Sequence, residues 1–195
     1  MKTLAAALLL GLVGASVEAA SLTALERERL AAHLEMTGSW LADEVSGLSA
    51  AQFQFRPAPG VWSILEVVDH LTVTDPIYWR QFQEAMKAPP SGKNLSDKDA
   101  DVLWYGIDRT RRTAALATET TTGQLREPKA GLDALRKLHS EMLKYVKTTQ
   151  EDLRAHFVPR EGSDAYQWLL LISTHEQRHI LQIREIKADP KFPKK

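Results

Sequence analysis

One stripe of residues, spaced three or four positions apart, runs through the C-terminal segment 163–187. It consists of Trp168, Ile172, His175, His179, Ile183 and Ile186. Residues at this spacing share one face of an α-helix, so the segment is predicted to be a helix with its apolar face in a core. Two imidazoles on that face point inward, where each unsatisfied polar group costs about 1–3 kcal/mol. Other elements must therefore cover this face, and the two histidines need partners.

The rest of the sequence predicts further helices and almost no strand. Apolar residues at helical spacing mark segments at about 23–48, 63–87, 97–116 and 129–156, and the first two begin with capping boxes at Thr23 and Ser63. Asp75-Pro76 predicts a kink or a restart in the second helix, because proline lacks the backbone donor. We predict an all-α fold, a four-helix bundle with one long connection across residues 88–129.

The composition fits a single domain of this kind. The chain has 195 residues, of which 44% are hydrophobic and 26% are charged. Its 25 basic and 25 acidic residues balance, which argues against a nucleic acid or an anionic membrane as a partner held by charge. The absence of cysteine excludes disulfides and thiolate sites, so any metal must be held by histidines and carboxylates.

Residues 1–19 have the layout of a secretory signal peptide. Lys2 precedes an apolar run from Leu4 to Val13, and the small residues beside Glu18 fit cleavage after Ala19. The apolar run is too short to span a bilayer. We expect a periplasmic or secreted protein whose domain covers residues 20–195, with no stable membrane insertion after cleavage. A retained N-terminal anchor is the alternative.

His175, Glu176 and His179 form the pattern H-E-x-x-H, which is found on the helix of zinc proteases. Side chains at positions i and i+4 can converge on one ion. Taken alone, the pair fits a metal site and two hydrogen-bonded core histidines equally well. Proteolysis is the least favoured reading, because Gln182 stands where the extended motif has a glycine, and Glu185 points away from the histidine face of a continuous helix.

A third histidine, His70, lies on the second predicted helix, on a face shared with Val67 that we expect to face the interior. The stretch LSAAQFQFRPAPGVWSILEVVDHL is followed about a hundred residues later by HEQRHILQI. Together they resemble the DinB/YfiT-like superfamily, whose members pair a W-S-x-x-E-x-x-x-H-L helix start with a late H-x-x-x-H helix. The resemblance covers roughly residues 22–188.

This resemblance implies an up-down-down-up bundle with the long crossover between bundle helices 2 and 3. It also implies a divalent metal held by His70, His175 and His179, and zinc or nickel suits three imidazoles. The resemblance further suggests thiol transferases or isomerases that activate a low-molecular-weight thiol on the metal. Metal-dependent hydrolysis of a small molecule is equally compatible with these residues. Export would separate such an enzyme from cytoplasmic thiols. The alternative is a non-catalytic metal-binding or stress-related bundle, and no catalytic acid or base is identified.

Other residues carry weaker signals. Glu66 caps a helix or orients a ligand, and Gln182 lies where it can support His179. Glu176 is either a base at the rim of the site or a surface carboxylate paired with a nearby arginine. Three histidines are predicted to lie at the surface or at a helix edge: His33, His139 and His156. Exposed faces of such bundles often pair, so a homodimer is compatible with the sequence.

Overall fold

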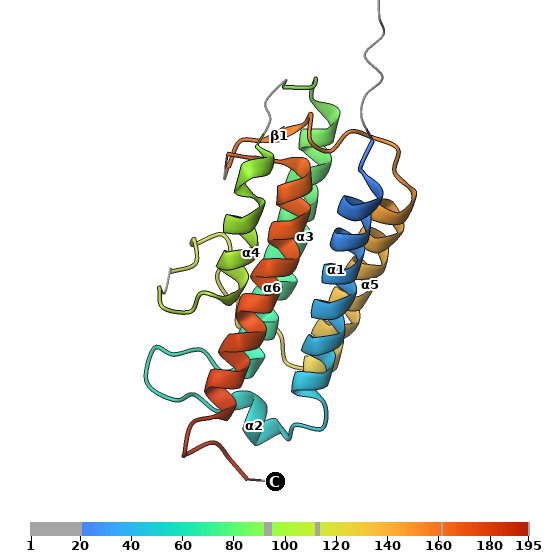
Figure 1. Ribbon diagram of the computed structural model, residues 1–195. Helices are drawn as coiled ribbons and strands as arrows, with labels where there is room; N and C mark the ends of the chain where they lie inside the picture. Colours follow the sequence, from blue (N-terminus) through green and yellow to red (C-terminus); the bar gives the residue numbers. More distant parts are fainter. Residues whose placement is uncertain (1–20, 92–94, 112–113, 161, 195) are drawn as a thin grey trace, which may run out of the picture.

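The structure is a computed structural model that describes residues 21–91, 95–111, 114–160 and 162–194 (Figure 1). The predicted signal peptide, residues 1–19, lies outside these residues. Within the described ranges, no helix combines the length and the apolar character needed to cross a bilayer.

Four long helices make up the bundle. They are α1 (Ala24–Val45), α3 (Ile64–Lys87), α5 (Pro128–Thr148) and α6 (Ala165–Lys187). The connections carry three short helical elements: α2 (Ala50–Gln54), the 3-10 turn η1 (Ser96–Lys98) and α4 (Asp99–Ile107). Two short antiparallel strands, β1 (Phe157–Val158) and β2 (Ser163–Asp164), precede α6.

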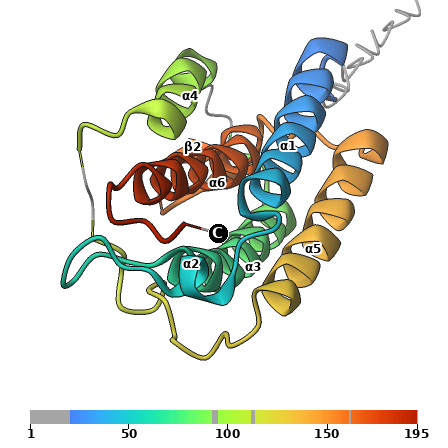
Figure 2. The same ribbon diagram turned by 90° about the horizontal axis from the view of Figure 1, so that it is seen from below.

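The helices have the predicted up-down-down-up connectivity. Helix α6 packs against α1 and α3, and α5 packs against the same two helices on the opposite side (Figure 2). Helices α1 and α6 run in one direction, whereas α3 and α5 run in the other (Figure 1). The crossover between α3 and α5 carries α4, which lies along α6. The predicted all-α bundle is therefore confirmed.

Side-chain caps fix where the helices begin. The predicted capping boxes at Thr23 and Ser63 are both present, and boxes of the same kind start α2 at Ser49 and α6 at Asp164. At α3, the Ser63 hydroxyl accepts a 3.3 Å hydrogen bond from the backbone of Glu66. Each box satisfies backbone donors that lack a partner within the helix.

Two predicted helices end earlier in the structure than in the prediction. Helix α5 stops at Thr148, because Thr149 adopts extended backbone angles. Leu153, which we placed on its stripe, is buried from the following loop instead. Helix α4 stops at Ile107 and does not reach residue 116. Apolar spacing alone did not show that the chain leaves the helix after Thr148 and still buries Leu153.

Helix α3 passes through Pro76 as one continuous helix, so the predicted restart does not occur. Proline removes one backbone donor, and the neighbouring turns are stabilised by packing on both sides of it. Tyr78 and Trp79, which follow the proline, are both buried in the core.

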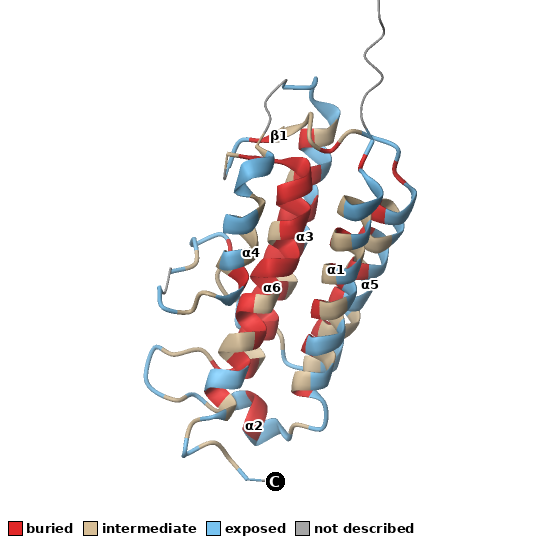
Figure 3. Ribbon diagram, viewed as in Figure 1, coloured by how far each residue is buried: buried red, intermediate tan, exposed pale blue. Residues whose placement is uncertain are grey.

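The apolar core has two parts, one toward each end of the bundle. On α6, the first part ends at Ile172 and the second begins at Ile180. The residues between them on all four long helices include buried polar groups. They are Thr37 on α1, Thr74 and Asp75 on α3, His139 on α5, and Ser173, Thr174, His175, Glu176, Arg178 and His179 on α6. Helix α6 is buried almost without interruption from Ala165 to Ile180 and supplies most of this polar layer (Figure 3).

Candidate metal centre

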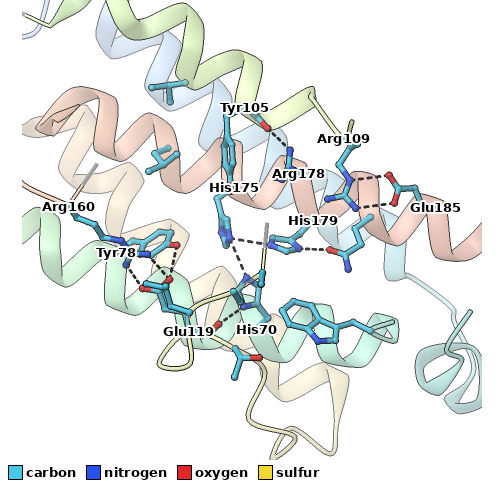
Figure 4. Close-up of a pocket in the computed structure, with 18 of the residues that line it drawn as sticks. His70, Tyr78, Tyr105, Arg109, Glu119, Arg160, His175, Arg178, His179 and Glu185 are labelled. Atoms are coloured by element: carbon cyan, nitrogen blue, oxygen red, sulfur yellow. Dashed lines mark hydrogen bonds and ion pairs between the residues drawn. The ribbon is translucent and has the colours of Figure 1, made fainter. Parts of the chain in front are cut away.

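The structure brings the three predicted histidines together. Nε2 of His175 lies 3.3 Å from Nε2 of His70 and 3.2 Å from Nε2 of His179, so three ring nitrogens converge on one point (Figure 4). His70 comes from α3, and the other two come from successive turns of α6. All three side chains are buried.

The outer nitrogens of two rings are held by oxygen acceptors. Nδ1 of His70 donates to the backbone carbonyl of Glu119 over 2.5 Å, and Nδ1 of His179 donates to Oε1 of Gln182 over 2.9 Å. Because these oxygens only accept, each ring carries its proton on Nδ1 and directs the Nε2 lone pair at the other rings. The predicted support of His179 by Gln182 is present.

These residues fit a divalent metal ion. Burial lowers the pKa of His70 and His175 to about 4, and burial and the neighbouring imidazoles hold the pKa of His179 well below its usual range. The rings are therefore neutral at pH 7. The Nε2 lone pairs of His70 and His179 both face Nε2 of His175, and the three ligand atoms lie within 4.8 Å of one another, an arrangement suited to a cation.

The imidazoles lie in an open cleft of about 1200 Å³ between α3, α4 and α6. Trp62, in the loop before α3, covers two of them. Its ring centroid lies 4.9 Å from that of His70 and 6.3 Å from that of His179, and it stacks on the latter. An indole in this position shields one side of the histidine group from water.

A polar group borders the three imidazoles on one side (Figure 4). Arg160 binds the Glu119 carboxylate through both guanidinium nitrogens, and the Tyr78 hydroxyl donates to the same carboxylate over 3.3 Å. Hydrogen bonding to Arg160 lowers the pKa of Glu119, and burial raises that of Tyr78. Glu119 and Arg160 could not be predicted from the sequence, because residues in irregular segments carry no periodic signal.

On the opposite side, two arginines connect α6 to the crossover. Arg109 forms a two-bond ion pair with Glu185, with both distances 3.0 Å. Arg178 donates to the backbone carbonyls of Tyr105 and Asp108 near the end of α4. Glu185 lines the cleft, although we expected it to point away from the histidines, and it engages Arg109 there.

Asp69, next to His70, anchors the loop that contains Glu119. Its carboxylate accepts hydrogen bonds from the Thr121 hydroxyl at 2.5 Å and from the Gly123 backbone at 2.8 Å. Burial alone would raise the pKa of Asp69, but these hydrogen bonds outweigh it and the pKa is lowered. The stretch TETTTG, residues 118–123, is thus fixed against α3.

Two predictions about single residues were wrong. Glu176 is fully buried and is neither at the rim of the site nor at the surface. His139 is also buried, and its Nε2 lies 3.4 Å from Oε2 of Glu176. Glu66 acts as the helix cap and also pairs with Arg56.

Comparisons with known proteins agree with this arrangement. The model of the DinB superfamily matches residues 33–183, a range that includes all three histidines. The uncharacterized protein YuaE of Bacillus subtilis (strain 168) is 29% identical over 148 residues, which are 74% of this chain and 89% of YuaE.

A solved structure also resembles this fold. YfiT from Bacillus subtilis is described as a probable metal-dependent hydrolase with an unusual four-helix bundle topology. It matches with a TM-score of 0.54 at 17% identity, over 90% of this chain and 93% of YfiT. At this level of identity the likeness supports the fold.

Proposed function

The chain belongs to the DinB superfamily, and from this premise we propose that it is a metal-dependent enzyme that hydrolyses a small molecule at His70, His175 and His179. The convergence of three Nε2 atoms in an open cleft carries the proposal. Within the described residues, the group around these nitrogens includes no fourth histidine or carboxylate. Such a site leaves coordination positions for water or substrate.

Zinc or nickel is the proposed ion, because both suit neutral imidazole ligands. When bound, such an ion supplies a Lewis acid that polarises a carbonyl or lowers the pKa of a water molecule. The description of YfiT as a probable metal-dependent hydrolase supports this class of reaction.

The surrounding residues define how a substrate is held. Trp62 offers an apolar face beside the histidines, and the Tyr78 hydroxyl is held toward Glu119 on the other side. Arg160 and Arg109 line the cleft as ion pairs with Glu119 and Glu185. A small molecule with a carbonyl group and an apolar portion fits this lining, and a cleft of about 1200 Å³ has room for it.

The metal is tested first, without any substrate. We expect protein purified without a histidine tag to carry a transition metal at the triad, and the His70→Ala and His179→Ala variants to carry about one equivalent less than the wild type. Elemental analysis after dialysis measures this. A wild-type protein that takes up neither zinc nor nickel at these residues would overturn the proposal.

Activity is tested on the loaded protein with panels of small esters, amides and lactones. We expect hydrolysis that disappears with chelation and in His70→Ala. Thiol transfer, tested with low-molecular-weight thiols, is the second candidate. A metal-loaded protein inactive in both panels would favour the alternative of a non-catalytic metal-binding bundle.

Export is also part of the proposal, since residues 1–19 have the features of a signal peptide. We expect cell fractionation to find the protein outside the cytoplasm, with its N-terminus at Ala20. A full-length chain in the cytoplasm would contradict this.

A further inference from the structure

A second group of metal-ligating side chains lies in the polar layer of the bundle. Asp75 on α3, His139 on α5 and Glu176 on α6 each direct one ligand atom at a common point, and these atoms lie within 4.8 Å of one another. Asp75 and Glu176 have no exposed surface, and His139 is 7% exposed. The side chains come from three different helices, so only the packed bundle assembles them.

The group lacks the hydrogen bonds that buried polar atoms normally make. Oδ2 of Asp75, Nε2 of His139 and both carboxylate oxygens of Glu176 have no hydrogen-bond partner. His139 and Glu176 approach to 3.4 Å, but without hydrogen-bond geometry. The other oxygen of Asp75, Oδ1, accepts one long hydrogen bond of 3.4 Å from the Thr74 hydroxyl.

Thr37 on α1, the hydroxyl nearest Glu176, directs its proton at the carbonyl of Leu34 over 3.4 Å. Four buried ligand atoms on the three side chains therefore remain without a protein partner, as expected where a cation binds.

Two features of the chain provide space for this group. A cavity of about 310 Å³ between α1 and α5 reaches His139 and Glu176. Gly38 forms part of its wall, and a Cβ atom there would lie only 2.6 Å from Nδ1 of His139. Glycine inside a helix is destabilising relative to alanine, and here it makes room for the imidazole.

We propose that Asp75, His139 and Glu176 bind a second divalent cation of the manganese, iron or zinc class. Two carboxylate oxygens and one imidazole form a harder donor set than three imidazoles, and oxygen-rich sets suit manganese. A bound cation engages the atoms that otherwise lack partners. The 310 Å³ cavity provides the route by which the ion enters.

The second site lies directly behind the first. The His175 ring separates them, since its Nε2 faces the histidine triad and its Nδ1 lies 3.8 Å from Oδ1 of Asp75. The second site shares no ligand with the triad, so the failure of one does not imply the failure of the other.

Manganese binding to His70→Ala tests the proposal, because this variant loses a triad ligand and keeps all three residues of the second group. Manganese is added to the metal-free variant, and the loss of the free-ion signal is followed by electron paramagnetic resonance. We expect about one bound equivalent. Adding Glu176→Gln or His139→Gln should weaken binding by at least the roughly tenfold typical of losing an outer-shell partner.

Glu35→Gln is the matched control, since Glu35 lines the same cavity but pairs with Lys147 at the surface. It should leave manganese binding unchanged. Circular dichroism checks that each variant is folded, and anomalous scattering at the manganese edge locates the ion in wild-type crystals without any substitution. Absence of binding at millimolar manganese, or binding that neither substitution weakens, would overturn the proposal.

Discussion

The backbone carbonyl of Glu119 accepts a 2.5 Å hydrogen bond from Nδ1 of His70, which lies 49 positions earlier in the chain. A loop residue thereby sets the tautomer of a helix residue, and with it the direction of the Nε2 lone pair. The same loop residue is held in place through its side chain by Arg160. The metal centre thus depends on a segment that contributes no ligand.

Arg160→Met should weaken metal retention about tenfold, because the loop that orients His70 loses its ion pair to Glu119. Competition with a chromogenic chelator measures the affinity. Arg126→Met, at an exposed position of the same connection, is the control and should leave the affinity unchanged. Equal affinities in both variants would show that the loop is held without Arg160.

Trp62 should report metal binding, since its ring stacks on His179. Titration of the metal-free protein with paramagnetic nickel should quench part of the tryptophan fluorescence. Trp62→Phe should lose that part, whereas Trp104→Phe, which changes a residue 62% exposed on α4, should retain it. Quenching that persists in Trp62→Phe would place the ion away from the triad.

Arg154 joins three helices at one end of the bundle. Its guanidinium binds Asp99 at 2.6 Å, Glu26 at 2.9 Å and Asp164 at 2.9 Å. Arg154→Met leaves these carboxylates without their cation and should cost roughly 2–4 kcal/mol of unfolding free energy at pH 7, near the range for a broken buried pair. Urea unfolding measures the difference, and a loss below 0.5 kcal/mol, within the usual range of surface substitutions, would contradict it.

The loss of unfolding free energy caused by Arg154→Met should be smaller at acidic pH than at pH 7. Burial would raise the pKa of Asp99 and Glu26, but hydrogen bonding with Arg154 and other donors lowers both below their usual values. Their contribution to stability is therefore complete above about pH 4.5 and is lost as pH falls through the lowered pKa values. Unfolding curves of wild type and variant at pH 7 and pH 3 should converge at the lower pH. An equal difference in unfolding free energy at both pH values would show that these carboxylates do not stabilise the protein through Arg154.

Gly106→Ala should destabilise the protein, although the same change in an exposed helix stabilises by about 1 kcal/mol. A Cβ at residue 106 would lie 2.7 Å from Oε1 of Gln177 and 3.0 Å from Cβ of Thr174, so α4 would have to move away from α6. We expect a loss of roughly 1–3 kcal/mol, typical of overpacking. Thermal unfolding measures whether Gly106→Ala lowers or raises stability. A higher melting temperature than that of the wild type would show that α4 can move away from α6 without loss of stability.

Local patterns in the sequence predicted the bundle well. Capping boxes at Thr23 and Ser63 set the starts of α1 and α3, because their hydrogen bonds lie within four residues. Helix ends were harder to predict. The stripe that includes Leu153 continues past Thr148, where the chain leaves the helix and still buries that leucine from a loop.

At the metal centre, too, local spacing was predictable and long-range contacts were not. The spacing of His175 and His179 placed them on one helical face, and the two motifs of the DinB superfamily added His70. The support of His179 by Gln182 was predictable from helical spacing, but the support of His70 was not. Glu119 and Arg160 lie in irregular segments, where position along the chain says nothing about distance in space.

The sequence alone thus determined the helices, their order and the three imidazoles, since each depends on spacing within one element or on a motif. Only the tertiary structure decided which polar side chains share the middle of the bundle. Asp75, His139 and Glu176 come from three helices, and nothing in their spacing relates one to another. Their meeting depends on how the helices are rotated and offset, which packing of the whole core determines.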